Sequence, residues 1–548
     1  MYRTLRVLLV ALLALVLATS APLAATADQG SGSLPTPSPN RHGFTHDDAL
    51  DLLAKARRQL RPDTRRVRER KPVGQGASTD ITMTLRDLYL ARPLLTGEQR
   101  RQADAMLARP SDPDGDDLGG GAPVTYPTLG RAHWCPTGGI ACIHWVTTGA
   151  ERISTADADL DGVPDYAETV YATMAQVWNA ETGTMGYRTP LPDDGTATDA
   201  DNPDSKLDIY LADLGTRGLY GYCAPEGSAA ARQVSGYCVL DNDFSRTQYG
   251  IAPINALRVT AAHEFFHAIQ FGYDVDEDVW FMEGSAAWIE DEVYDAINDN
   301  YQFLRDSPIR YPHAPLDYSV GIHRYGAFLF FKYAAERLRD RNVVRQFWDA
   351  AAAPRDRFSL QSIRAVIAAR HVSWATFFSV FASWNTLPAG SYSERGAYPA
   401  PAYALTKVLS TRSRAARTTG WRSLNLPHAS SSTIRLVPNA RLKPRKRVLV
   451  EVNAPNSARG ATALIQRRFR NGTVTHAMMP LNSRGDGRAL LGFDRRVISS
   501  IVVVVSNTST TMRDCGHVGD GYGGPLYSCY GRGYFDRAQT YSVRATLR

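Results

Sequence analysis

The stretch Thr260-Ala-Ala-His263-Glu264-Phe-Phe-His267-Ala-Ile-Gln270 contains the pattern His-Glu-x-x-His. Apolar side chains recur at helical spacing from Val259 to Ile269, which predicts a helix with one buried face that ends near Gly272. Two histidines four positions apart share a helix face, so both rings can bind one metal ion. Glu264 can reach a water held by that metal. The segment therefore predicts a zinc centre for hydrolysis rather than an ordinary helix with two polar histidines.

Zinc needs a third protein ligand, with the fourth position left to water. A second helical segment, Trp280–Asp291, carries Glu283 after a gap of fifteen residues from the second histidine. This gap fits a turn followed by an antiparallel helix, and the small residues Gly284–Ala287 permit close helix packing. We therefore expect Glu283 as the third ligand, and Asp274 and Glu290 are the alternative ligands. The non-functional interpretation of this segment is a solvated acidic helix face. Glu290 is also placed to orient a ligand histidine.

His263-Glu264-x-x-His267 followed by Glu283-Gly284-x-Ala286-x-Trp288-x-Glu290 resembles the gluzincin zinc metallopeptidases, and most of all the secreted metalloproteases of bacteria. The resemblance implies that His263, His267 and Glu283 hold zinc and that Glu264 is the general base. The motif pair covers about thirty residues. A weaker likeness extends through Lys206–Leu211 and Tyr325–Tyr333.

Two motifs that mark other zinc peptidases are missing from the sequence. Gluzincin aminopeptidases carry a Gly-x-Met-Glu-Asn segment that captures the free amine of the substrate, and this chain has none. Metzincins place a Gly three residues and a third His six residues after the second His, where this chain has Gln270 and Tyr273. The resemblance therefore implies an endopeptidase that acts on a protein or peptide substrate.

Peptide hydrolysis also needs a donor for the negative charge that develops on the carbonyl oxygen. The segment Tyr318–Phe331 places several donors before an apolar helix. In the gluzincins a Tyr or His from this downstream region plays the role, and the family Tyr stands three residues before a Gly that opens the helix. Relative to Gly326 that position is His323, so the match to Tyr is not kept. Tyr325 and Tyr318 are rival donors, and packing of Tyr325 at a helix start is the non-catalytic alternative.

A second motif, Asp157-Ala-Asp-Leu-Asp-Gly-Val-Pro-Asp-Tyr-Ala-Glu168, matches an EF-hand-type calcium loop at positions 1, 3, 5, 6, 9 and 12. Gly162 supplies the sharp turn. A strand, Ala141–Val146, precedes the loop and a helix follows from about Asp165 to Thr182, so we expect a structural rather than a sensory site. The predicted Ca²⁺ ligands are Asp157, Asp159, Asp161, Asp165, Glu168 and the carbonyl of Val163.

The N-terminus has the pattern of a secretory signal over residues 1–27. Arg3 and Arg6 precede a short apolar run, Leu8–Leu17, and Ala25-Thr-Ala27 fits a cleavage site. A membrane span needs about 20 apolar residues, and no segment reaches that length. We expect a secreted, extracellular protein with no membrane span in its mature form.

Six cysteines fall into three close pairs along the chain. Short loops favour sequential pairing among the fifteen possible connectivities, and the absence of Cys-x-x-Cys spacing disfavours a zinc cluster. Paired cysteines agree with export to an oxidising environment. The expected disulfides are Cys135 with Cys142, Cys223 with Cys238, and Cys515 with Cys529.

The net charge of +7 is concentrated in Lys55–Lys71, where nine Lys or Arg face two acids, and the rest of the chain is balanced. This run has no interleaved aromatic residues, so we expect a solvated linker or a processing site and no nucleic-acid partner.

The 548 residues suffice for about three structural units. In residues 28–125 a low-complexity stretch, 28–45, should be disordered. Helical patterns follow at His46–Leu60 and Ile81–Leu107, and Ser111–Gly121 has the composition of a linker. Residues 28–125 are therefore either a prosegment or an accessory region that stays attached.

The remainder predicts an α+β fold. Residues 126–398 form the gluzincin-like metallopeptidase domain, with a strand at Leu207–Leu211 beside the cleft and helices through about Thr386. Residues 399–548 alternate or run apolar between turns, which predicts a C-terminal β-sandwich-like domain. Its expected strands are Thr433–Val437, Val448–Val452, Ala463–Ile465, Ile501–Ser506 and Tyr541–Thr546.

Two functions fit these patterns. The first is a secreted zinc-dependent endopeptidase in which Glu264 takes the proton from a metal-activated water and His323 or Tyr325 stabilises the oxyanion. The alternative is a non-catalytic exported protein, stabilised by calcium, that binds a cell surface or carbohydrate. The intact Glu264 favours the enzyme, because a binding module needs no general base.

Overall fold

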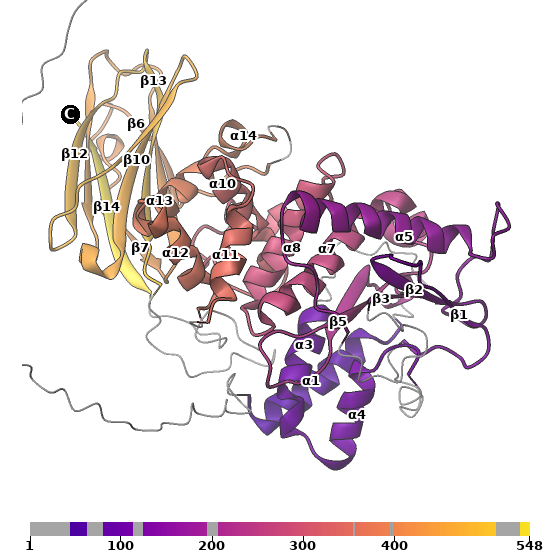
Figure 1. Cartoon of the computed structure of the whole chain (residues 1–548). Coiled ribbons are helices and arrows are strands. Elements are labelled where there is room, and N and C mark those ends of the chain that lie inside the picture. The colour runs from indigo at the N-terminus through magenta and orange to yellow at the C-terminus, as the bar shows by residue number, and fades with distance from the viewer. Residues whose placement is uncertain are drawn as a thin grey trace, which may run out of the picture. The chain divides into compact units, whose positions relative to one another are not determined.

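A computed structural model describes residues 44–62, 81–112, 124–193, 206–354, 357–394, 396, 398–510 and 538–548 of the chain. All of them belong to one compact unit, Pro39–Arg548. The predicted signal peptide, nearly all of the low-complexity stretch, and both Cys515 and Cys529 lie outside the described residues. Helices and sheets occur together, so the predicted α+β class is confirmed (Figure 1).

The first sheet contains five strands in the order β1-β2-β3-β5-β4. The inner strands β2, β3 and β5 are parallel, whereas β1 and β4 run antiparallel to their neighbours, which leaves β4 at one edge. The predicted strands at Ala141–Val146 and Leu207–Leu211 are present as β2 and β3. Every residue of both is buried, as expected for parallel strands covered on both faces. The bounds are β1 Arg131–Trp134, β2 Ala141–Val146, β3 Leu207–Ala212, β4 Gly221–Pro225 and β5 Gly236–Asp241.

Two long helices, α7 and α8, pack together beside this sheet, and α7 lies against β4 and β5. The first helix does not end at Gly272, as the sequence suggested, but continues to Asp274. Gly272 lacks the positive φ of a helix C-cap, and an ideal Cβ there would make only ordinary contact with Leu191, at 3.5 Å from its backbone nitrogen. This glycine therefore does not terminate the helix. The bounds are α5 Asp165–Trp178, α6 Arg246–Tyr249, α7 Pro253–Asp274 and α8 Val279–Val293.

Further helical segments surround this pair. The helix expected to reach about Thr182 is α5, which ends at Trp178 and passes into a π-helical turn, η3. The bounds are η3 Asn179–Thr184, η4 Gly215–Arg217, η5 Asp299–Asp306, α9 His323–Gly326, α10 Phe328–Leu338, α11 Val343–Ala351, α12 Ser359–Ala369, α13 Trp374–Trp384 and α14 Pro388–Ser391. No single helix among the described residues is long and apolar enough to cross a membrane; α12 and α13 reach that length only together, across a bend of 104°.

The N-terminal region is helical and packs on the sheet, with α3 against the edge strand β4. All eleven residues of α3 are buried. Part of the basic run is a helix and not a linker, because Lys55–Gln59 form the end of α1, and Arg217 Nε donates to the carbonyl of Leu60 at 3.1 Å. The bounds are α1 His46–Gln59, α3 Ile81–Ala91, η1 Arg92–Leu94 and α4 Gly97–Leu107.

The C-terminal region contains two antiparallel-rich sheets with the strand orders β11-β10-β13-β8-β6 and β12-β9-β14-β7. Residues of both sheets share one hydrophobic core, which forms a sandwich. All five predicted strands are present, as β8, β9, β10, β13 and β14. The bounds are β6 Leu405–Leu409, β7 Arg422–Leu426, β8 Ser430–Pro438, β9 Arg447–Asn453, β10 Ala461–Phe469, β11 Val474–Met478, β12 Asp486–Gly492, β13 Ile498–Asn507 and β14 Gln539–Leu547; η6 Ala415–Arg417 and η7 Ser457–Arg459 are short turns.

The sandwich packs on α13 through β10 and β13. Successive side chains of β13 point to opposite faces. Ile501, Val503 and Val505 enter the core of the sandwich, whereas Val502 and Val504 join the core of the helical region. This double burial explains the uninterrupted apolar run in the sequence of β13.

Candidate metal centre

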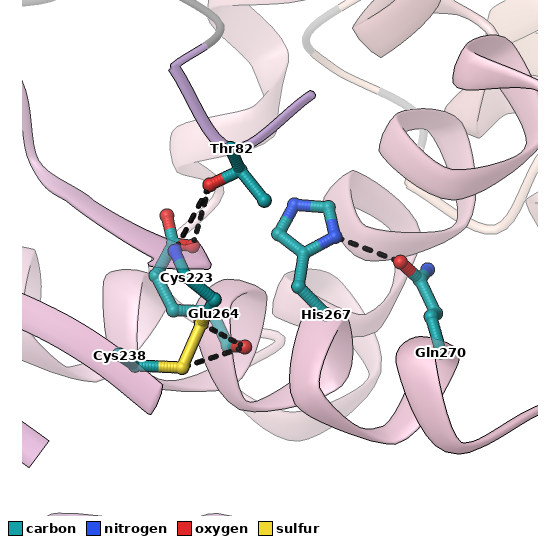
Figure 2. The surroundings of a disulfide bond; sticks show 6 residues. All are labelled: Thr82, Cys223, Cys238, Glu264, His267 and Gln270. Carbon is teal, nitrogen blue, oxygen red and sulfur yellow. Dashed lines mark hydrogen bonds between the residues drawn. A yellow bond between two sulfur atoms is a disulfide. The ribbon is translucent and has the colours of Figure 1, made fainter. Parts of the chain in front are cut away.

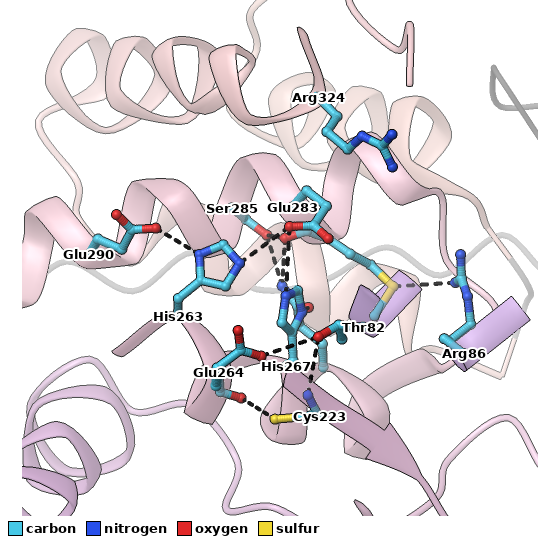
Figure 3. Close-up of polar contacts among 12 residues, drawn as sticks. Thr82, Arg86, Cys223, His263, Glu264, His267, Glu283, Ser285, Glu290 and Arg324 are labelled. Carbon is cyan, nitrogen blue, oxygen red and sulfur yellow. Dashed lines mark hydrogen bonds and ion pairs between the residues drawn. The ribbon is translucent and has the colours of Figure 1, made fainter. Parts of the chain in front are cut away.

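The helices α7 and α8 bring His263, His267 and Glu283 together (Figure 3). Glu283 Oε2 lies 3.2 Å from His263 Nε2 and 3.7 Å from His267 Nε2. One ligand atom from each of the three residues lies within 4.8 Å of the others. His267 and Glu283 are each 1% exposed. Two nitrogens and a carboxylate oxygen thus face a single point, as the sequence predicted.

The other ring nitrogen of each histidine is engaged by a fixed acceptor. His263 Nδ1 lies 2.7 Å from Glu290 Oε1, and His267 Nδ1 lies 2.7 Å from Gln270 Oε1. Gln270 is held in turn, because its Nε2 donates to the carbonyl of Met282 at 2.9 Å. When Nδ1 donates its proton to such a partner, Nε2 keeps a free lone pair for a metal. Sequence reasoning missed Gln270, although its position one turn after His267 was a usable signal.

The charges in this cluster depend on one another. Burial by itself would raise the pKa of Glu283, but hydrogen bonds from His263 and His267 bring that pKa well below its usual value. Burial raises the pKa of Glu290 to about 7, against the opposing effect of its bond with His263. Glu283 is therefore the carboxylate that is held ionised, which suits a metal ligand.

The donor set fits zinc. Two ligands at about 2.1 Å from a tetrahedral zinc ion lie roughly 3.4 Å apart, close to the separations between Glu283 and the two histidines. The alternative third ligands are engaged elsewhere: Asp274 pairs with Arg232, and Glu290 contacts the far nitrogen of His263. Three protein ligands leave one coordination position for water, as in catalytic sites.

Glu264 lies beside this cluster and is 7% exposed. Burial raises its pKa, while the neighbouring histidines lower it. A side chain at Gly221 on β4 would collide with Glu264, because an ideal Cβ would lie 2.8 Å from Glu264 Cγ. Glycine at this position of the edge strand thus makes room for the candidate base.

A threonine from the N-terminal region contacts Glu264, and this contact was not predicted from the sequence. The hydroxyl of Thr82, at the start of α3, donates to Glu264 Oε2 at 3.3 Å and accepts from the backbone nitrogen of Cys223 at 3.1 Å (Figure 2). Cys223 is bonded to Cys238 across β4 and β5, and its sulfur lies 3.0 Å from the carbonyl oxygen of Glu264. This disulfide therefore joins the edge strand β4 to β5, and its sulfur packs against the centre of α7.

A cleft with an empty volume of about 720 Å³ opens beside His263 and Glu264. Tyr325 lines this cleft; its ring lies 6.0 Å from the ring of His263 and stacks on Phe303 at 4.8 Å. His323 does not line the cleft. It is 5% exposed, and burial lowers its pKa.

Tyr318 lies against His323, with 5.7 Å between the ring centroids, and does not line the cleft either. Of the three predicted oxyanion donors, the structure thus brings only Tyr325 to the cleft.

The chain gives no significant match to a protein-family model or to a curated protein. The case for a function therefore rests on the geometry of this site and on the motifs of this chain.

The predicted calcium loop lies between β2 and α5 and is mostly exposed. Carboxylate oxygens of Asp157, Asp159 and Asp161 lie within 4.8 Å of one another. Gly162 adopts a φ of +95°, and its nitrogen donates to Asp157 Oδ2 at 3.0 Å, which forms the predicted turn.

The remaining predicted calcium ligands, Val163, Asp165 and Glu168, do not belong to this group of three carboxylates. Asp165 Oδ1 accepts from the nitrogen of Ala158 at 2.9 Å. Desolvation is the largest cause of a raised pKa at Glu168, and electrostatic repulsion from the nearby aspartates is the next. The Glu168 carboxylate thus interacts with the charges of the loop. Val163 begins the approach to α5, and its nitrogen donates to Asp161 Oδ1 at 2.8 Å.

Two of the three expected disulfides are present, Cys135 with Cys142 and Cys223 with Cys238. The third expected pair lies outside the described residues. Sequential pairing is thus confirmed for the described cysteines and is compatible with an oxidising environment.

Proposed function

We propose that the protein is a secreted zinc-dependent endopeptidase with a gluzincin-like catalytic domain. The observation that carries this proposal is the convergence of His263 Nε2, His267 Nε2 and Glu283 Oε2 with Glu264 alongside, at the edge of an open cleft. Hydrogen-bonded Nδ1 atoms on both histidines support a metal-binding role, because they orient each Nε2 toward Glu283, where a metal ion could take the place of the bridging proton.

Bound zinc would polarise the substrate carbonyl and lower the pKa of a water molecule. Glu264 accepts the proton of that water on its carboxylate and delivers it to the leaving amine. The raised pKa of Glu264 suits this exchange, because a carboxylate that is too acidic holds a proton poorly. Tyr325, on the wall of the cleft, donates its hydroxyl hydrogen to the developing oxyanion.

The N-terminal helices bear on whether the secreted protein is active at once or only after this region is removed. The hydroxyl of Thr82 donates a hydrogen bond to Oε2 of Glu264, the proposed base. This contact supports a prosegment that restrains Glu264 until the prosegment is displaced. A mature N-terminus between about Leu107 and Thr125 would agree with removal, within the soft boundary of a linker. Secreted protein that begins at Asp28 would show that the region stays attached.

The experiment that tests the function is casein cleavage by the secreted protein, with inhibition by a chelator and recovery on addition of zinc. Glu264→Gln should keep its zinc yet lose at least about 10²-fold in kcat, because the amide accepts no proton. Glu292→Gln is the matched control, since Glu292 lies on α8 but pairs with Arg341 at 2.8 Å.

Two results would contradict the proposal. A zinc-replete Glu264→Gln protein with normal cleavage would exclude the mechanism. Wild-type protein that holds zinc but cleaves neither casein nor peptides would leave the calcium-stabilised binding protein as the better reading.

A further inference from the structure

Two walls of the cleft come from segments joined by one loop. The turn η5 contributes Asp299, Gln302 and Phe303, and α9 contributes Tyr325. Residues 307–322 connect η5 to α9. This loop leads directly into α9, the helix that carries the proposed oxyanion donor and that also packs on α8 and η5.

The sandwich holds this loop through its β7–β8 turn. His428 Nε2 lies 2.8 and 2.9 Å from the two carboxylate oxygens of Asp317, and both side chains are 0% exposed. Beside this pair, the nitrogen of Leu316 donates to the carbonyl of Ala429 at 2.9 Å, and the nitrogen of Ser431 donates to the carbonyl of Pro312 at 2.7 Å. Three neighbouring contacts thus fix the loop to the turn and to the start of β8.

The turn itself is constrained. Ala429 adopts a φ of +43°, in the region that favours glycine. A non-glycine residue remains there only when its surroundings impose the conformation. The nitrogen of Ala429 donates to the carbonyl of Ser509 at 3.2 Å, so both backbone polar groups of Ala429 are hydrogen-bonded. A strained turn that is bonded on both sides is a rigid support for the loop.

The loop is also connected to the donor on its other side. The ring of Tyr318, the residue after Asp317, packs against the buried ring of His323 with 5.7 Å between the centroids, and His323 is the first residue of α9. Tyr325 follows two residues later. The loop that His428 holds through Asp317 therefore packs against the helix that carries Tyr325.

We propose that His428 is a positioning residue of the active site, which acts through Asp317 to hold loop 307–322 and thereby orients Tyr325. The C-terminal sandwich is then a part of the catalytic structure and not a separate binding module. This inference rests on the proposed function, because orientation of Tyr325 matters only if Tyr325 donates to a reacting carbonyl.

Attachment of the sandwich does not depend on this pair. Leu464, Val502 and Val504 belong to the core of the helical region, and Gln466 Nε2 donates to Ser383 Oγ at 2.9 Å on α13. The two interfaces are therefore separable. Loss of His428 should loosen the loop while the sandwich stays docked.

The test compares His428→Ala, His428→Gln and the control Gln466→Ala, which removes a buried polar contact of the sandwich remote from the loop. For His428→Ala we expect kcat to fall about 10- to 100-fold, the penalty of a misplaced catalytic group. KM and zinc content should change less than about threefold, and hydrogen exchange should accelerate in peptides covering 307–322. Glutamine can still donate to Asp317, so His428→Gln should recover part of kcat.

The control should lower the melting temperature without a selective loss of kcat. Equal losses of kcat in His428→Ala and Gln466→Ala would reduce His428 to a general structural role and overturn the proposal, as would wild-type kcat in His428→Ala. If His428→Ala does not fold, His428→Gln and Asp317→Asn carry the same comparison. If wild-type protein cleaves nothing, the proposed function fails, but the hydrogen-exchange comparison can still be made. Unchanged hydrogen exchange of residues 307–322 in His428→Ala would then refute the proposed role of His428 on its own.

Discussion

The two candidate metal sites of this protein are built in opposite ways. The histidine site would draw its ligands from α7 and α8, and its histidines are hydrogen-bonded to Glu290 and Gln270. The predicted calcium loop would take its ligands from twelve consecutive residues, and its aspartates accept mainly from backbone nitrogens of the same loop.

This contrast teaches where each site is vulnerable. The histidine site depends on packing between two consecutive helices, so a change in a supporting residue should weaken it without touching a ligand. The predicted calcium loop depends on local turn geometry and charge, so the effects of a substitution there should remain local.

The largest effect is expected when Glu283 is removed from the histidine site. Glu283→Ala should lower zinc affinity by more than about 10²-fold, because the loss of a direct ligand exceeds the usual penalty for a supporting residue. Zinc content after dialysis, measured by mass spectrometry, checks this. Glu292→Gln on the same helix is the control and should retain zinc. Full zinc occupancy in Glu283→Ala would transfer the ligand role to another carboxylate.

A smaller, graded effect is expected at Glu290, which touches only the far nitrogen of His263. Glu290→Ala should weaken zinc binding by about 10- to 100-fold. Glu290→Gln should cost less, because an amide oxygen can still accept the Nδ1 proton. Competition with a chromogenic zinc chelator gives both affinities. Equal affinities in the two variants would show that the hydrogen bond to His263 does not support the metal.

The same contrast explains what the sequence could predict. His263 and His267 were predictable because a single helical turn relates them, and Glu283 because a fifteen-residue gap fits a helical return. The clustering of Asp157, Asp159 and Asp161 was predictable because the whole pattern is contiguous, and calcium binding there stays a prediction. The strands β8, β9 and β13 were predictable because buried apolar runs or alternation mark them.

Features that depend on packing between remote segments were not predictable. Thr82 reaches Glu264 across 182 positions of the chain, and no local pattern signals that contact. Tyr325 and His323 lie two positions apart on α9, so their side chains diverge by about 200°. Which of them faces the cleft follows from how α9 is docked, not from its composition. Strands β7 and β12 were missed because nearly all of their residues are exposed or only half-buried, so no long apolar run marks them.

The smallest effect is expected at the calcium loop, where loss of a predicted ligand should not destabilise the calcium-free fold. Calcium at about ten times its Kd should stabilise the fold by about 1.4 kcal/mol, which is roughly 3 °C in melting temperature for a large domain. In Asp159→Asn, calcium should no longer raise the melting temperature.

Without calcium, Asp159→Asn should be at least as stable as wild type, because it removes one of the negative charges that crowd Glu168. Thermal scans with and without calcium, with exposed Asp51→Asn as control, check both parts, and zinc content should not change. A lower melting temperature of Asp159→Asn in calcium-free buffer would mean that Asp159 supports the turn by its own hydrogen bond to the nitrogen of Asp161 more than it repels its neighbours. The calcium loop would then resemble the histidine site, as a structure that is held in place before its ion binds.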